Sequence, residues 1–149
     1  GLSLCASADL VVAVDSAKFT SAYTKAGLSP DGSSTYFLPR RIGDRRAREL
    51  MLTNRLLSAA EAESWGLVNQ VVPEDQLTEA TQALVAMMTT GPTRAFGAVK
   101  RLLNESSHTS LETQMELETR EIASCAMSED GREGINAFLA KRAPTYHGQ

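Results

Sequence analysis

One carboxylate in this sequence lies where a lone base could work. Asp31 falls within the run SPDGSST at residues 29–35, which is dense in turn-forming residues. In such a run Pro30 presets φ for a turn and Gly32 supplies an open backbone geometry. The turn would therefore deliver a single carboxylate to the lip of a pocket, just before a predicted helix. One carboxylate placed there can remove a proton from a substrate and return it elsewhere, which is general acid–base chemistry.

The same turn also has a purely structural interpretation. By turn chemistry alone, about two such Asp residues in three are cap or turn residues. For Asp31 to act as a base, apolar neighbours would have to desolvate it against the opposing effect of a helix N-terminus. Tyr36, Phe37 and Leu38 follow directly and could form that apolar wall.

The remaining candidates for chemistry are weaker. His108 and His147 lack a second histidine or a cysteine at metal-ligand spacing, so we expect no metal. The sequence contains no phosphate-binding loop, dinucleotide fingerprint or nucleophile elbow. Ser3 and Ser7 have no base near them in the sequence and are interpreted as capping or small packing residues.

The elements that position the Asp31 turn are predicted to form an α/β chain. Its second half is expected to be almost entirely helical. Residues 10–14, LVVAV, form an apolar run typical of a strand buried on both faces in a parallel sheet. A second strand is predicted at residues 67–72. Ser58 and Glu61 match a capping box at a helix start. Helices are expected near residues 1–7, 33–42 (short or kinked at Pro39), 44–53 (capped by Asp44), 58–65, 77–90, 92–103, 111–125 and 128–141 (capped by Ser128).

Length and composition fit one globular domain or a large piece of one. The 149 residues are 42% hydrophobic and 22% charged, which excludes a disordered tail or a fibre. A net charge of −3 gives no positive electrostatic field that would attract nucleic acid. No apolar run approaches the about 18 residues that suggest a membrane span. Cys5 and Cys125 are interpreted as small core residues in a reducing compartment, so we expect a cytoplasmic protein.

Several separated motifs resemble the crotonase superfamily of enoyl-CoA hydratases and isomerases. They are GLSLCASADL at residues 1–10, Phe19, residues 27–40, LLSAAEA at 56–62 with WGLV at 65–68, and EDGREG at 129–134 with AFLAKRAP at 137–144. The motifs agree in order and spacing, which makes the resemblance specific. It covers essentially the whole chain, but only the C-terminal part of a family domain.

The resemblance implies a fold of ββα repeats followed by a helical region, in trimers or pairs of trimers. Residues 1–90 would be the C-terminal part of the core and residues 91–149 the helical trimerisation region. The implied ligand is an acyl-CoA thioester, with no separate cofactor, whose enolate oxygen two backbone N–H groups stabilise. Both donors are expected upstream of Gly1, so the chain is expected to be a truncated piece that is inactive alone.

The resemblance also discriminates within the family. Hydratases carry two glutamates that position water, and the matching residues here are Ser3 and Tyr23. Asp31 matches the single Asp or Glu of certain enoyl-CoA isomerases, nearest to those of ring-epoxyphenylacetyl-CoA. A double-bond isomerase with Asp31 as proton shuttle is therefore favoured. The alternatives are a hydratase, a non-catalytic acyl-CoA-binding or oligomerising chain and, more distantly, the nucleophilic Asp of aroyl-CoA dehalogenases.

Two residues near the C-terminus resemble the family's CoA contacts. Phe138 and Lys141 would lie one turn apart on the last predicted helix, so both would project to one side. In the family the matching Phe and Lys approach the CoA nucleotide, often across a subunit boundary. The alternative is that Lys141 is a solvated charge that interacts favourably with the helix dipole.

Overall fold

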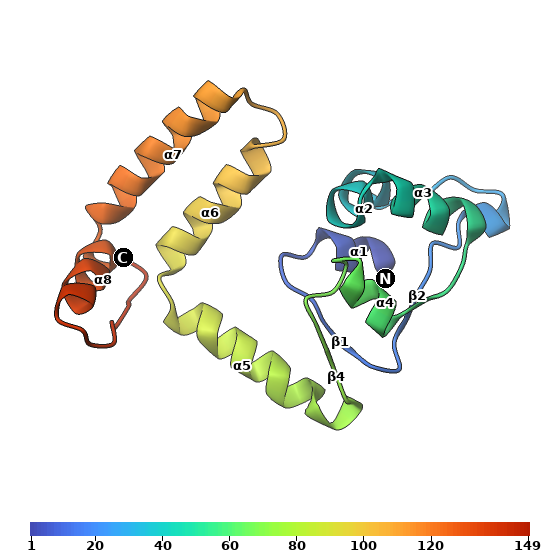
Figure 1. Cartoon of the computed structure of the whole chain (residues 1–149), viewed down its shortest axis with the longest axis horizontal. Coiled ribbons are helices and arrows are strands. Elements are labelled where there is room, and N and C mark those ends of the chain that lie inside the picture. Colours follow the sequence, from blue (N-terminus) through green and yellow to red (C-terminus); the bar gives the residue numbers. More distant parts are fainter. The chain divides into compact units, whose positions relative to one another are not determined.

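The computed structural model describes all 149 residues, and it divides the chain into two compact units, Gly1–Gln82 and Ala83–Gln149 (Figure 1). The predicted α/β class with a largely helical second half is confirmed. The division falls inside α5 (Leu77–Thr90), whereas the sequence placed a boundary after this helix. The roles assigned to residues 1–90 and 91–149 stay predictions.

The first unit combines short strands with four short helices and two single turns of 3₁₀ helix. Its elements in chain order are α1 (Leu2–Ser7), β1 (Val12–Val14), β2 (Lys18–Phe19), η1 (Thr24–Ala26), α2 (Ser34–Ile42), α3 (Asp44–Thr53), β3 (Leu57–Ser58), α4 (Ala59–Ser64), β4 (Gln70–Val72) and η2 (Glu74–Gln76). Strand β1 pairs in parallel with β4, Ala13 lying opposite Val71. Strand β2 pairs antiparallel with β3.

The first predicted strand is confirmed as a parallel strand, but it is shorter than predicted. Strand β1 begins at Val12, and Leu10 is 42% exposed. The Asn69 side chain accepts a hydrogen bond from the Val11 N–H at 2.8 Å, and the Asn69 N–H donates to the Val11 carbonyl at 2.9 Å. A side chain thus takes the place of a ladder bond just before the strand begins.

Buried aliphatic side chains hold the first unit together. Leu38, Leu50 and Leu57 have no exposed area, and each contributes about 1.5–3 kcal/mol by burial. The buried Ala6 and Ala47 lie on α1 and α3, where small side chains allow close packing. The helices α1, α2 and α3 consequently gather around one core (Figure 1).

The helix starts follow the predicted caps in most cases. The capping box of α4 is confirmed: the Ser58 hydroxyl accepts from the Glu61 N–H, and the Glu61 carboxylate accepts from the Ser58 N–H. These bonds from Ser58 are the main cause of the lowered pKa of Glu61. The predicted cap at Asp44 is wrong, because Gly43 holds the cap position and the Asp44 carboxylate instead pairs with Arg48 one turn later.

The second unit consists of helices: the end of α5, then α6 (Thr93–Glu105), α7 (Leu111–Ala126) and α8 (Glu129–Leu139). Ser110 and Ser128 cap α7 and α8, each hydroxyl accepting a backbone N–H three residues on, so the predicted cap at Ser128 is confirmed. Helices α6 and α7 lie side by side, and the Arg101 guanidinium binds both carboxylate oxygens of Glu121 across them, at 3.1 and 3.0 Å (Figure 1).

The predicted end of the last helix is wrong. Helix α8 ends at Leu139, and Lys141 has a left-handed backbone with φ +53°. The Lys141 N–H donates to the Phe138 carbonyl and the Arg142 N–H to the Ala137 carbonyl, which is the Schellman pattern of a helix C-terminus. This helix end could not be predicted from residue types, because glycine is the usual residue at the left-handed position.

The last residues of the chain fold back onto α8. The buried Asp130 carboxylate accepts the N–H groups of His147 and Gly148, at 2.7 and 2.8 Å. Glu133 binds the Arg142 guanidinium through both oxygens and accepts the Thr145 N–H. The Arg142 guanidinium is the main reason that the pKa of Glu133 falls to about 2.

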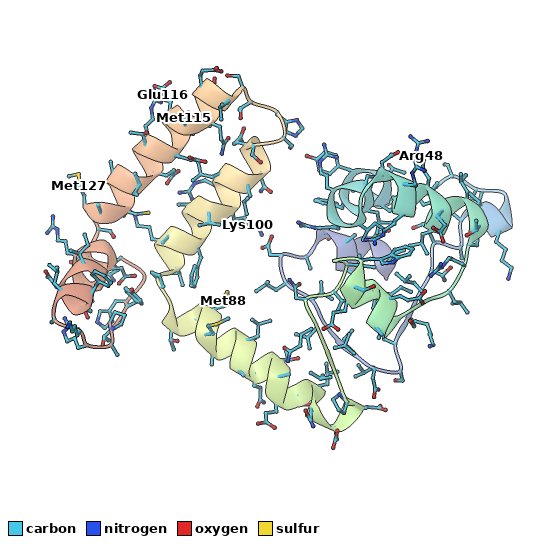
Figure 2. All side chains as sticks on the ribbon, in the orientation of Figure 1. Arg48, Met88, Lys100, Met115, Glu116 and Met127 are labelled. Atoms are coloured by element: carbon cyan, nitrogen blue, oxygen red, sulfur yellow. The ribbon has the colours of Figure 1, made fainter.

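Large apolar side chains remain exposed on the helices of the second unit. Met115 on α7 is 58% exposed, and Met127 at its C-terminal end is exposed as well (Figure 2). A groove of about 560 Å³ between α6 and α7 is lined mainly by apolar residues, among them Val99, Leu102, Met115 and Ile122. No helix of the chain combines the length and apolarity needed to cross a bilayer.

The junction of α7 and α8 predicts a sharp difference between two helical glycines. A Cβ added at Gly131 would lie 2.0 Å from the Cys125 carbonyl oxygen, whereas one at Gly97 would meet nothing closer than the Arg101 guanidinium at 3.5 Å. Gly131→Ala should therefore lower the free energy of unfolding by about 1–3 kcal/mol. Gly97→Ala should raise it by about 0.5–1 kcal/mol, because alanine is the better helix former. Urea unfolding of both variants tests this, and equal effects would contradict it.

The exposed apolar faces predict self-association. Apolar patches larger than a few hundred Å² usually mark interaction surfaces. We expect the 149-residue chain to sediment as a concentration-dependent oligomer, and the double variant Met115→Lys, Ile122→Lys to shift it toward monomer. Analytical ultracentrifugation that shows a clean soluble monomer at micromolar concentration would contradict the prediction.

Candidate functional site

Three residues that are distant in the sequence meet beside the turn that carries Asp31. The Tyr23 hydroxyl donates to Oδ1 of Asp31 at 2.6 Å. Oγ of Ser3 lies 3.5 Å from the Tyr23 hydroxyl oxygen and donates to the Asp31 carbonyl oxygen at 3.4 Å. The structure thus brings the candidate base together with the two residues that the resemblance matched to the hydratase glutamates.

The first turn of α2 anchors the backbone of Asp31. The Ser34 N–H and the Ser34 hydroxyl both donate to the Asp31 carbonyl oxygen, at 3.1 and 2.8 Å. Gly32 and Ser33 both have left-handed backbones, with φ +58° and +60°. Two consecutive left-handed residues reverse the chain between Asp31 and the helix, and the buried Ser34 side chain fixes that reversal.

A separate loop presents Tyr23. The Tyr23 carbonyl accepts the N–H groups of Ala26 and Leu28, at 2.9 and 3.0 Å, which close the loop around η1. The Thr24 hydroxyl donates to the Met51 carbonyl, and the Lys25 N–H donates to the Asn54 side chain. Since Met51 and Asn54 belong to the end of α3 and its cap, the Tyr23 loop is tied to a helix rather than left unsupported.

Helix α1 presents Ser3. Arg41 of α2 donates to the Ala6 and Ala8 carbonyls, at 3.2 and 3.4 Å, and so ties the C-terminal end of α1 to α2. A Cβ built at Gly32 would lie 3.1 Å from Cβ of Ser3. The turn therefore approaches α1 so closely that a side chain at residue 32 would press against Ser3.

The apolar wall expected around Asp31 does not form within these 149 residues. Asp31 is exposed, while Leu38 lies wholly inside the core. Leu38 turns inward because Ser34, Leu38 and Ile42 share the buried face of α2 at four-residue spacing. Tyr36 instead carries the Arg40 guanidinium 3.7 Å from its ring centroid.

Phe138 and Lys141 belong to the second unit of the chain, whereas Ser3, Tyr23 and Asp31 belong to the first. Phe138 is 83% exposed on α8, and Lys141 lies beyond the end of that helix. The expectation that both project from one helix face is wrong, since the left-handed turn at Lys141 redirects the chain. Their contact with CoA stays a prediction.

The hydrogen bond between Tyr23 and Asp31 was not predicted from the sequence. In the family resemblance, Tyr23 only marks a position at which hydratases carry a water-positioning glutamate. The bond to Asp31 joins two residues that lie outside helices and strands, where no periodicity indicates which side chains face one another. The pairing depends on the tertiary contacts that place the two loops.

The comparisons with known proteins agree on one family. The sequence profile of the enoyl-CoA hydratase/isomerase family matches residues 1–149. The chain is 40% identical over 149 residues to the 1,2-epoxyphenylacetyl-CoA isomerase of Escherichia coli (strain K12), which covers 100% of this chain and 57% of that protein. It is 35% identical over 141 residues to the 4-chlorobenzoyl coenzyme A dehalogenase-1 of an Arthrobacter species, covering 95% of this chain and 51% of the relative.

Solved structures give the same answer for the fold. An enoyl-CoA hydratase/isomerase from Cupriavidus metallidurans CH34 superposes with a TM-score of 0.92 at 34% identity, covering 99% of this chain and 56% of that one. An enoyl-CoA hydratase from Bacillus anthracis superposes with a TM-score of 0.93 at 32% identity, covering 100% of this chain and 58% of that one. The chain spans just over half the length of the relatives it matches. It belongs to the enoyl-CoA hydratase/isomerase family, within the crotonase superfamily, and has the crotonase fold.

Proposed function

We propose that this chain carries the proton-transferring residue of an enoyl-CoA isomerase, which shifts a double bond through an enolate intermediate. The observation that carries the proposal is the Ser3–Tyr23–Asp31 cluster, in which Asp31 is the one acid. Similarity to an epoxyphenylacetyl-CoA isomerase supports it. An acyl-CoA thioester as substrate and a homo-oligomeric assembly, trimeric or a pair of trimers, are parts of the same proposal.

A double-bond shift needs only one base. The base removes a proton beside the thioester carbonyl, and the electron pair moves toward the thioester oxygen to give an enolate. The same group then returns the proton to a carbon farther along the chain. Oδ1 of Asp31 accepts the Tyr23 hydroxyl, so Oδ2 is the oxygen available to carry the proton.

The enolate oxygen needs donors of its own. In the family two backbone N–H groups supply them, and by the resemblance both are expected upstream of Gly1. Losing one such donor typically costs about 10²–10³ in rate. The proposal therefore assigns turnover to the protein that joins this chain to the preceding part of a family domain, and expects none from residues 1–149 alone.

Hydration is the main alternative. It needs a water molecule that is held and deprotonated, and the two residues matched to the water-positioning glutamates are Ser3 and Tyr23. Hydroxyls can hydrogen-bond water but are poor bases at neutral pH. The likeness to a dehalogenase keeps a nucleophilic role for Asp31 as a further alternative, and a non-catalytic acyl-CoA-binding chain is the remaining one.

Removing the base tests the proposal directly. In the joined protein, Asp31→Asn keeps the shape of the side chain but removes the proton acceptor. We expect kcat for migration of the double bond in a 3-enoyl-CoA to fall by at least about 10²–10⁴, with substrate affinity nearly retained. Asp75→Asn, an exposed change in η2 outside the site, serves as the control and should leave kcat unchanged.

Two results would overturn the isomerase proposal. Migration at the wild-type rate in Asp31→Asn would return Asp31 to a turn or cap role, since Asn caps nearly as well as Asp. Rapid addition of water to a 2-enoyl-CoA by the wild type would establish a hydratase instead.

The CoA contact proposed for Lys141 can be separated from its structural role. Lys141→Ala should weaken CoA binding by about 1–2 kcal/mol through loss of a charge-assisted phosphate contact. Lys141→Gly should weaken binding equally but stabilise the fold by about 1 kcal/mol, because glycine accepts the left-handed backbone. Titration calorimetry measures the affinity for CoA, and urea unfolding measures the stability of the fold. The exposed Lys18→Ala is the control and should change neither. Unchanged affinity in both variants would make Lys141 a solvated charge.

A further inference from the structure

We infer that Tyr23 is the positioning residue for Asp31, and that its hydroxyl selects the carboxylate oxygen that carries the proton. The inference rests on the proposed function, because it concerns the same carboxylate. It goes beyond that function in giving Tyr23 a task of its own, where the family resemblance marked only a missing glutamate.

The hydrogen bond itself is the first argument. At 2.6 Å, the contact between the Tyr23 hydroxyl and Oδ1 of Asp31 has the length of an O–H bond to an ionised acceptor. An ionised carboxylate only accepts, so the hydroxyl is the donor. With Oδ1 engaged, the carboxylate cannot turn about its Cβ–Cγ bond without losing a charge-assisted bond.

Both ends of this bond are anchored independently, which is the second argument. The two donors on Ser34 hold the Asp31 carbonyl, and the Tyr23 carbonyl accepts two N–H groups of its own loop. Thr24 and Lys25 then tie that loop to the end of α3. Because both residues are already held in place, little conformational entropy is lost when the bond forms. The bond can therefore orient the carboxylate before substrate arrives.

Ser3 cannot take over this task. Its hydroxyl donates to the Asp31 carbonyl oxygen rather than to the carboxylate, and at 3.4 Å that bond is long. Its separation of 3.5 Å from the Tyr23 hydroxyl is at the limit of a hydrogen bond. Ser3 contacts the Asp31 backbone, while Tyr23 sets the direction of the carboxylate.

The consequence for the reaction is a single proton-carrying oxygen. Oδ2 takes the proton from the substrate carbon as the C–H electron pair moves into the enolate. It gives the same proton back when the enolate collapses onto the more distant carbon. A carboxylate held at Oδ1 keeps the protonated oxygen facing the substrate between the two steps, and a freely turning one would lose the proton to water.

The test uses Tyr23→Phe in the joined protein, with a 3-enoyl-CoA deuterated at the carbon beside the thioester carbonyl. Phe keeps the ring and removes the donor, and because the Asp31 carboxylate is exposed, water can replace the lost bond and the unfolding midpoint should change little. We expect kcat to fall by about 10–10², KM to stay within about twofold, and less deuterium to reach the new position. Tyr146→Phe, a half-buried tyrosine in the second unit, is the matched control and should change none of these. Ser3→Ala should have a much smaller effect on deuterium transfer.

The outcomes separate this inference from the proposed function. Wild-type kcat and deuterium transfer in Tyr23→Phe, alongside a large loss in Asp31→Asn, would overturn the role of Tyr23 and leave Asp31 as the base. Full activity in Asp31→Asn would overturn both, and the fault would then lie with the proposed function. If Tyr23→Phe melts at a lower temperature, rates are compared below both midpoints; deuterium transfer equal to that of the wild type would still reject the inference.

Discussion

The candidate site depends on how closely the turn at Gly32 approaches α1. Two facts make this residue glycine: its φ of +58° is left-handed, and a Cβ would press on Ser3 at 3.1 Å. The approach is possible because α1 packs on α2, with Ala6 and Leu38 buried between them. The approach places the Asp31 turn beside Ser3, and the loop tied to α3 brings Tyr23 to the carboxylate. Core packing thus sets the geometry of the site, and the site residues contribute little to the core.

Elements fixed by rules of short range could be predicted from the sequence. The capping box of Ser58 and Glu61 and the cap at Ser128 depend on residues three positions apart, and the structure has both. Strand β1 was predicted too long because its first ladder position is filled by Asn69, which lies far along the chain. The end of α8 was missed because Lys141 adopts a backbone that favours glycine, and no local pattern announces such a substitution.

The same distinction between short-range and long-range effects applies to the candidate site. Turn chemistry singled out Asp31 from its own neighbours, and the family resemblance pointed to Ser3 and Tyr23. What joins them could not be predicted, because the bond between Tyr23 and Asp31 depends on two loops anchored to α2 and α3. The same limit explains the missing apolar wall. Leu38 was expected beside Asp31 because the two are close in the sequence. In the structure the helical periodicity of α2 places the Leu38 side chain in the core.

Electrostatics explains why the three residues belong together as a set. Carboxylates at residues 3 and 23 would add negative charge near Asp31, and neighbouring like charges disfavour the ionised forms. One carboxylate with two hydroxyls removes that conflict, since each hydroxyl can donate toward the acidic residue. The same exchange removes the bases that would activate water and leaves a single group able to accept a proton. Under the proposed function, a site of this composition would move a proton within a substrate, and the Tyr23 hydroxyl would hold the Asp31 carboxylate in place.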